Sequence, residues 1–217
     1  MLQNELYKII SRTEKRGFRE GLRYVRGQIY STSKYYVFRH NMDKIPDMTS
    51  QFNNFRVIEI HDPDCALFGE IYRVWPSETR PNDEKYIKEL LRERSKNGIM
   101  CFVLLHKDHL AGANWLSRPN HYYSNLAIPY LPDEYISYWT FIVSSYRGMG
   151  ASKLLKSSSL CIAKQKEISS VISISSVKNT PSIRMNLGIG YKIIGTFTEQ
   201  RRLFQYRQHF MAMNSKV

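Results

Sequence analysis

The chain has 217 residues, of which 42% are hydrophobic and 13% aromatic, and its formal net charge is +13. This length supports one sizeable core and is short for two full domains, so we expect one domain with an N-terminal extension. No leader-like segment or apolar run of transmembrane length is found, which predicts a soluble, cytoplasmic protein.

Charge and cysteine content limit the kinds of ligand that the chain is expected to bind. The positive charge predicts an anionic partner, which could be a phosphate-bearing cofactor, an acidic protein, a membrane surface or nucleic acid. The aromatic residues lie mostly within predicted strands rather than among basic residues, which does not favour nucleic acid. Cys65, Cys101 and Cys161 are widely spaced, so we expect buried free thiols and no metal site.

Residues 1–34 are predicted to form a basic helical arm. Residues 1–40 contain nine lysines and arginines but only three acidic residues, so nearly half of the net charge lies there. Apolar residues recur at helical spacing from Leu6 to Ile10 and again from Phe18 to Ile29. Such a helix either packs its apolar face on the domain or contacts an anionic membrane or an acidic protein.

The rest of the chain, residues 35–217, alternates between strand and helix patterns. Runs of β-branched and aromatic residues predict strands, and apolar residues at helical spacing between capping signals predict helices. The expected strands are 35–40, 55–61, 99–106, 110–116, 135–143, 169–176, 191–197 and 201–207. The expected helices are 82–98, 151–167 and 180–189. A polar stretch at 117–134 predicts a functional loop or a loop that contains one short extra strand, and the order of elements predicts an α+β fold around one sheet.

The stretch SSYRGMGASKLL, residues 144–155, places two glycines between a predicted strand and a predicted helix. The first N–H groups of a helix have no acceptor within the helix, and the helix dipole favours an anion there. Gly148 and Gly150 would let the backbone approach a ligand closely, and Arg147 adds a positive charge. The spacing matches neither the P-loop nor the dinucleotide fingerprint. An ordinary tight turn would use the same residues, so both interpretations stay open.

Two segments in this order resemble the Gcn5-related N-acetyltransferase (GNAT) superfamily. The stretch FIVSSYRGMGAS resembles the signature Gln/Arg-x-x-Gly-x-Gly/Ala, with Arg147 and Gly150 matching and Ser152 replacing the last residue. The stretch NTPSIRMNLGIGY, which begins at Asn179 after a predicted strand, resembles the second motif. The resemblance extends over roughly residues 55–210. It implies a GNAT-like α+β fold with a central mixed, mostly antiparallel sheet flanked by helices.

The resemblance also implies a ligand and its binding residues. The donor substrate would be acetyl-coenzyme A or another acyl-coenzyme A, the acceptor an amine, and no metal would take part. Arg147 would lie beside the pyrophosphate. The backbone N–H groups that bind the pyrophosphate would be those of Gly148, Met149, Gly150, Ala151 and Ser152. The pantetheine arm would lie between two adjacent parallel strands, with Ile142 and Val143 as the matching backbone positions and Asn179 and Ser182 nearby.

The resemblance defines the catalytic residues less fully than the cofactor-binding residues. Many family members carry a tyrosine general acid in the short helix, and Asn186 occupies that position here, where it can at most donate a hydrogen bond to sulfur. The alternatives are an unassisted thiolate, Tyr191 or a water molecule. Glu134, with Asp133 beside it, is the candidate general base, although a carboxylate next to such a loop is usually just solvated. Tyr138 is a second candidate.

The sequence therefore predicts an N-acyltransferase that uses a coenzyme A thioester and an amine acceptor. The alternative from another class is a non-catalytic binding module. Such a module would keep the coenzyme-binding fold and use its basic surface on nucleic acid, a membrane or an acidic protein.

Overall fold

The computed structural model describes residues 30–48, 52–62, 64–74, 99–119, 127–202 and 205–213, together with Phe18, Val25 and Arg92. The predicted arm up to residue 29 and the predicted helix 82–98 lie outside the described residues, apart from these three. No helix among the described residues is both long and apolar enough to cross a membrane.

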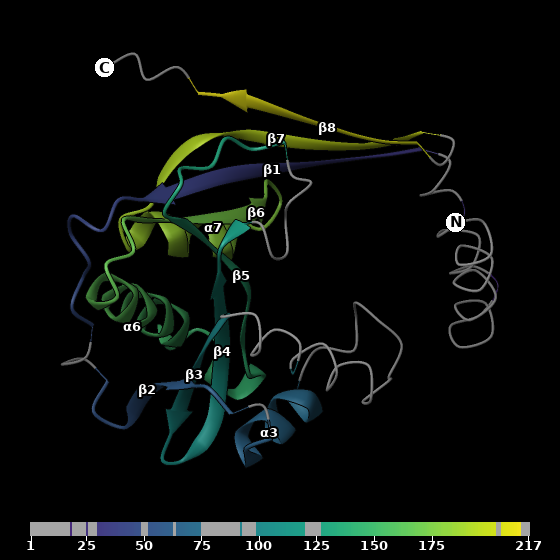
Figure 1. Cartoon of the computed structure of the whole chain (residues 1–217). Coiled ribbons are helices and arrows are strands. Elements are labelled where there is room, and N and C mark those ends of the chain that lie inside the picture. The colour runs from purple at the N-terminus through teal and green to yellow at the C-terminus, as the bar shows by residue number, and fades with distance from the viewer. Residues whose placement is uncertain are drawn as a thin grey trace.

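One eight-stranded sheet, in the order β2-β3-β4-β5-β6-β1-β7-β8, organises the described residues (Figure 1). Its strands are β1 (Tyr30–His40), β2 (Phe55–Ile60), β3 (Met100–His106), β4 (His109–Ser117), β5 (Glu134–Ile142), β6 (Ser170–Ser176), β7 (Lys192–Arg202) and β8 (Gln205–Ala212). β5 and β6 are parallel, and all other neighbouring strands in the sheet are antiparallel. The predicted mixed, mostly antiparallel sheet is confirmed.

Three helices and a short 3-10 turn complete the described elements. They are α3 (Ala66–Val74), η2 (Ser144–Tyr146), α6 (Ala151–Gln165) and α7 (Thr180–Gly188). The sequence predicted α6 and α7 but not α3. It was also wrong to place residues 30–34 in the helical arm, because β1 begins at Tyr30 and pairs there with β7.

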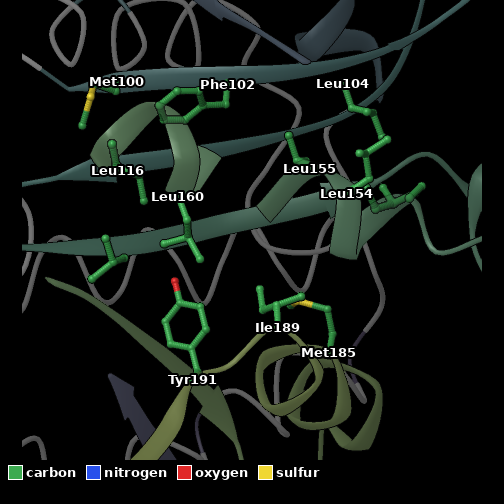
Figure 2. Close-up of a cluster of buried hydrophobic side chains, with 14 of the residues drawn as sticks. Met100, Phe102, Leu104, Leu116, Leu154, Leu155, Leu160, Met185, Ile189 and Tyr191 are labelled. Carbon is green, nitrogen blue, oxygen red and sulfur yellow. The ribbon is translucent and has the colours of Figure 1, made fainter. Parts of the chain in front are cut away.

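Two apolar layers pack on opposite faces of the sheet. Along β3, successive side chains point to opposite faces, as the pleat of a strand requires. Phe102 and Leu104 pack with Leu155 of α6 in one cluster, which Figure 2 shows. Val103 packs with Phe68 of α3 in the other. The middle of the sheet is therefore buried on both faces, and this packing holds β4, β5 and β6 in place.

The three cysteines are free thiols, as expected, but they do not share the predicted burial. Cys101 is buried between the sheet and α3, Cys65 is half-buried, and Cys161 of α6 is exposed.

Candidate active site

A β-bulge interrupts β5 where β5 and β6 separate. The register of β4 against β5 shifts so that Trp139 and Thr140 stand opposite the single residue Asn114. Trp139 has a φ of 50°, which lies in the left-handed region that bulky residues rarely adopt. The parallel pairing of β5 with β6 ends at Ser137 opposite Ser173. Beyond this pair the two strands leave a gap in the sheet.

The side chain of Asn114 holds the two sides of the bulge together. Its Oδ1 accepts hydrogen bonds from Ser137 Oγ at 2.9 Å and from Thr140 Oγ1 at 2.8 Å. Asn114 is 1% exposed, so these bonds lie away from competing water. These two hydrogen bonds therefore stabilise the bulge.

A pocket of about 390 Å³ opens at the gap. β5 and β6 form two of its walls, and β1, α6, the start of α7 and β7 supply the rest. Its hydroxyl and amide lining groups belong to Ser137, Thr140, Ser173, Ser175, Ser176, Asn179 and Ser182, beside the phenols of Tyr35 and Tyr138. Lys156 and Glu199 are its charged lining residues. Such a lining suits an extended polar ligand that carries an amine or an anionic group.

The turn between β5 and α6 has the backbone that its glycines suggested. Gly148 has a φ of 80° and Gly150, the N-cap of α6, a φ of 82°. A Cβ added at Gly150 would lie 2.8 Å from Cζ of Phe52, whereas one added at Gly148 would meet no atom within 4 Å. Among the described residues, no side chain accepts a capping hydrogen bond at this end of α6, which leaves its first N–H groups without a side-chain partner there.

Lys156 of α6 is a buried amine in the wall of the pocket. Its side chain is 3% exposed, and its Nζ donates to Ser173 Oγ at 2.9 Å and to Asn186 Oδ1 at 3.0 Å. The ring centroid of Tyr191 lies 5.4 Å from the same nitrogen. Burial lowers the pKa of the Lys156 amine to about 7.

Comparison with known proteins shows which folds this geometry resembles. No family model matches the chain, and no curated protein matches its sequence. Solved structures do match. A GCN5-related N-acetyltransferase from Sphaerobacter thermophilus aligns with 91% of this chain and 59% of its own at a TM-score of 0.56 and 10% identity. A tandem GNAT protein from the clavulanic acid biosynthesis pathway aligns with 83% of this chain and 58% of its own at a TM-score of 0.53 and 15% identity.

The chain has the GNAT fold. A Drosophila protein also aligns with it, over 86% of this chain and 57% of its own, at a TM-score of 0.53 and 13% identity. The chain thus spans 57% to 59% of the length of these three structures. At these identities the likeness shows the fold, and the activity has to be argued from the residues of the site.

Within the GNAT fold, the residues predicted to bind the cofactor form two groups. The turn group runs from the exposed Arg147, Gly148 and Met149 through the half-buried Gly150 into the first residues of α6, the buried Ala151 and the half-buried Ser152. The second group, Asn179 and Ser182, lines the pocket. Asn179 Oδ1 accepts the Ser182 N–H at 3.2 Å, which caps α7. Their ligand contacts stay predictions.

Ile142 and Val143 differ from the predicted arrangement. The Val143 N–H donates to the Ala111 carbonyl at 2.9 Å, and the Ile142 carbonyl accepts from Arg147 Nε at 3.0 Å. Both groups are therefore engaged within the protein. The β5 residues that line the pocket are 136–140, which include the bulge, whereas Ile142 and Val143 are not among its lining residues. Their predicted role in cofactor binding stays a prediction.

The position of the expected tyrosine acid holds a buried amide. Asn186 is fully buried and does not line the pocket, unlike its partner Lys156. Its Nδ2 donates to Ser173 Oγ at 3.4 Å and to Ser175 Oγ at 3.3 Å. Tyr191, the alternative acid, is buried in the apolar cluster of Figure 2, and burial raises its pKa. A raised pKa makes Tyr191 a poorer proton donor.

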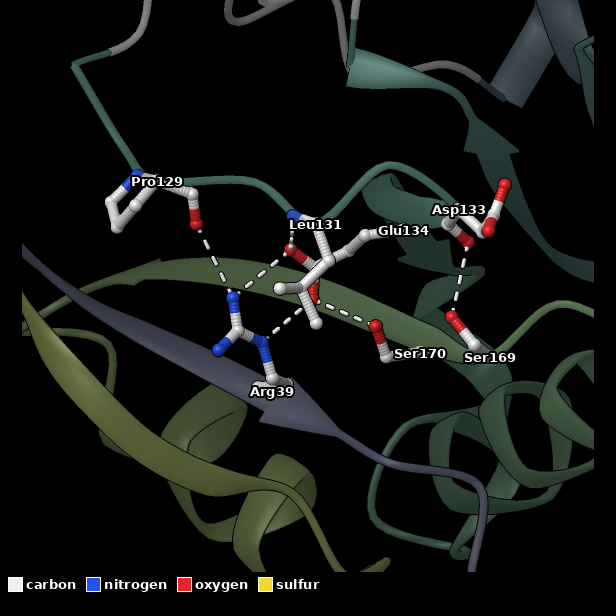
Figure 3. Close-up of polar contacts among 7 residues, drawn as sticks. All are labelled: Arg39, Pro129, Leu131, Asp133, Glu134, Ser169 and Ser170. Atoms are coloured by element: carbon white, nitrogen blue, oxygen red, sulfur yellow. Dashed lines mark hydrogen bonds and ion pairs between the residues drawn. The ribbon is translucent and has the colours of Figure 1, made fainter.

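Glu134 lies at the start of β5, outside the pocket lining. Its carboxylate accepts from Arg39 Nε at 2.7 Å, Arg39 Nη2 at 3.1 Å, Ser170 Oγ at 2.9 Å and the Leu131 N–H at 3.1 Å (Figure 3). Glu134 is fully buried, so it is not the solvated carboxylate of the alternative interpretation. Its role as general base stays a prediction, and four hydrogen bonds favour a structural role that joins β1, β5 and β6. Asp133, beside it, is likewise outside the pocket.

Tyr138 is buried at the bulge and lines the pocket, where the sequence placed a second catalytic candidate. The two charged pocket residues, Lys156 and Glu199, were also missed, and each carried a signal. Lys156 precedes Leu160 by four residues and so shares a helix face with a core residue. Glu199 follows the buried Phe197 by two residues and so shares its strand face. A charged residue at a core spacing was the signal in both cases.

Proposed function

We propose that the chain is an N-acyltransferase that moves an acetyl or another acyl group from a coenzyme A thioester to an amine. The observation that carries this proposal is the polar pocket between the separated parallel strands, together with the uncapped N-terminus of α6. A pantetheine arm is extended and carries amide groups, so it suits a gap in which two strands no longer pair. A pyrophosphate suits the N–H groups of residues 148 to 152.

Different residues of the site would bind different parts of the ligand. Gly148 and Gly150 bring the backbone N–H groups toward the phosphates, and Arg147 adds positive charge at the same end. Asn179 and Ser182, at the start of α7, line the pocket and would contact the pantetheine arm. A backbone N–H of the bulge would polarise that carbonyl, which is the usual way to stabilise an oxyanion.

Glu199 is the pocket carboxylate, and we propose it as the group that binds the acceptor amine. It accepts hydrogen bonds from Tyr35 Oη at 3.2 Å and from Tyr206 Oη. Burial and the charge of Glu199 raise the pKa of Tyr35, so its phenol stays a donor to the carboxylate. A carboxylate held in this way can attract an ammonium ion and accept its proton. The location of Glu199 in the pocket favours it over Glu134 for this task.

Two parts of the proposal concern the chain as a whole. Residues 30–217 would form the catalytic domain of a cytoplasmic enzyme. The basic arm, residues 1–29, would contact an anionic membrane or an acidic protein by charge attraction. Loss of binding to anionic vesicles on removal of residues 1–29, with coenzyme affinity unchanged, would support this role of the arm.

Titration calorimetry with acetyl-coenzyme A, followed by thiol release on a panel of amines, tests the proposed function. We expect binding, and thiol release with at least one amine. Gly150→Glu should abolish most of the binding, because its charge repels the phosphates at the N-terminus of α6 and its Cβ, which would meet the Phe52 ring, shifts the turn. Ser145→Glu places the same charge on the exposed turn η2 and is the matched control, since a mere change of net charge would affect both.

Two results would count against the activity. Equal coenzyme A affinity in the wild type and in folded Gly150→Glu would refute the phosphate site. Coenzyme binding without thiol release on any amine would favour a non-catalytic binding module. Pantetheine, which lacks the nucleotide and its phosphates, should bind both proteins equally.

A further inference from the structure

The pocket contains an amine, Lys156 Nζ, whose charge has no carboxylate partner among the described residues. Within the part of the chain that the structure describes, Lys156 Nζ forms two hydrogen bonds, both with neutral acceptors, Ser173 Oγ and Asn186 Oδ1. A lysine is seldom buried unless it is paired with an acid. Retaining one in a pocket wall therefore costs stability, and a function at this position would explain why it is kept.

The two hydrogen bonds fix the orientation of this nitrogen. An ammonium group has three N–H bonds, of which two are directed at the Ser173 and Asn186 oxygens. The third position is an N–H in the charged form and a lone pair in the neutral form. A proton can therefore be given or taken at one defined position of a side chain that lines the pocket.

We propose that Lys156 is the catalytic proton donor to the departing sulfur, a role that rests on the proposed function. The attacking nitrogen forms the C–N bond, the C–S bond breaks, and its electron pair goes to sulfur. The third N–H of Lys156 then transfers its proton to that sulfur. The neutral amine regains a proton from the one that the attacking nitrogen loses, so an amine and a thioester become an amide and a thiol with Lys156 unchanged.

The neighbouring groups are consistent with this role. Burial, rather than a nearby charge, lowers the pKa of the Lys156 amine to about 7, so both protonation states are populated near neutral pH. The titratable groups around it are Tyr191 beside its nitrogen, and Tyr35, Tyr138 and Glu199 elsewhere in the pocket lining. Asn186 is a positioning residue, because it reaches the reaction through Lys156.

The thiolate absorbance of bound coenzyme A tests the contact without any acceptor amine. In the wild type, Lys156 should stabilise the thiolate by forming an ammonium–thiolate pair. Lys156→Met keeps the length of the side chain but removes the charge. We expect it to lower the thiolate fraction of the bound coenzyme about tenfold near pH 7, where the Lys156 amine is still partly protonated. The S-methyl thioether of coenzyme A, which has no thiol, provides the baseline.

Two further variants serve as controls. Lys164→Met changes a lysine of the same helix whose Nζ donates to the Met42 carbonyl, and it should leave the thiolate fraction unchanged. Lys156→Gln keeps an N–H donor without the titration and should behave as Lys156→Met does. If neither Lys156 variant folds, the wild-type ε-amine signal in nuclear magnetic resonance replaces them. It should move on addition of coenzyme A and much less with the thioether.

The outcomes separate the two proposals. An unchanged thiolate fraction in Lys156 variants that still bind coenzyme A, or an ε-amine signal that responds equally to both ligands, overturns the role of Lys156 and leaves the acyltransferase proposal standing. Failure of the folded wild type to bind coenzyme A overturns both.

Discussion

Replacing Lys156 should change how the stability of the fold depends on pH. The pKa of this amine is about 7 in the folded protein, against 10.5 for the free side chain, because burial disfavours its charged form. Between these two values the unfolded chain binds more protons than the folded one. The free energy of unfolding therefore rises with pH across this window in the wild type.

The size of the effect follows from the two pKa values. For one group with this difference, the free energy of unfolding rises by about 2 kcal/mol between about pH 7 and about pH 9. Lys156→Met should lose this rise. It also leaves Asn186 Oδ1 without its donor and removes one of the two donors to Ser173 Oγ, at a cost of about 1–3 kcal/mol that does not depend on pH in this range. The change of the free energy of unfolding with pH, rather than its value at one pH, therefore tests the low pKa of Lys156.

Urea unfolding followed by circular dichroism at a series of pH values measures this slope. The difference between wild type and Lys156→Met removes the contribution of other groups, including Cys161, whose pKa burial raises. Lys164→Met, with an exposed side chain on the same helix, should keep the wild-type slope. Parallel curves for wild type and Lys156→Met would refute the low pKa and with it the placement of this amine in a dry site.

Three other predictions concern the turn, the ion pair and the pocket carboxylate. Gly148→Ala should lower the free energy of unfolding by about 1–2 kcal/mol because of its positive φ, and Gly150→Ala should lower it further because its Cβ also meets a ring carbon at 2.8 Å; equal losses in urea unfolding would contradict that contact. Glu134→Gln should lower the free energy of unfolding by about 3 kcal/mol through the loss of the Arg39 ion pair, with kcat nearly unchanged; a fall in kcat of about 100-fold or more would restore Glu134 as the base. Glu199→Gln should raise KM for the amine and leave the affinity for acetyl-coenzyme A as it is, and steady-state kinetics with calorimetry would reveal the opposite pattern if Glu199 contacts the coenzyme.

Most strands could be predicted because they carry a local pattern of β-branched and aromatic residues. The predicted strand 201–207 was wrong, because β7 continues to Arg202 and β8 runs from Gln205 to Ala212, so that Arg201 pairs with Tyr206 across the hairpin. The boundary of β1 was wrong because residues 30–34, YSTSK, are mostly polar, and pairing with β7 extends the strand beyond its apolar part. Helix α3 was missed because it is nine residues long and contains Gly69. Packing of Phe68 and Ile71 under the sheet stabilises it, and that contact is not local in the sequence.

The same distinction between local and long-range contacts applies to the candidate site. The glycine turn could be predicted because its function depends on consecutive backbone groups, and Gly148 and Gly150 do have left-handed φ values. Glu134 could not be judged from its neighbours, because its partner Arg39 lies 95 residues away in the chain. The bulge in β5 depends on Asn114 of another strand, and it determines where the pocket opens.

Asn186 and Lys156 are best understood as one departure from the expected pattern rather than two. A phenol at position 186 would supply its own proton to the sulfur, and a lysine on the adjacent helix would then be a buried charge without a task. With an amide at 186, the side chain offers an acceptor oxygen to Lys156 Nζ, while its nitrogen donates to two serines of β6. The amide thus allows an amine to be buried at a tolerable cost, and the amine supplies the acidic proton that the amide lacks. Each residue gives a physical reason for the other.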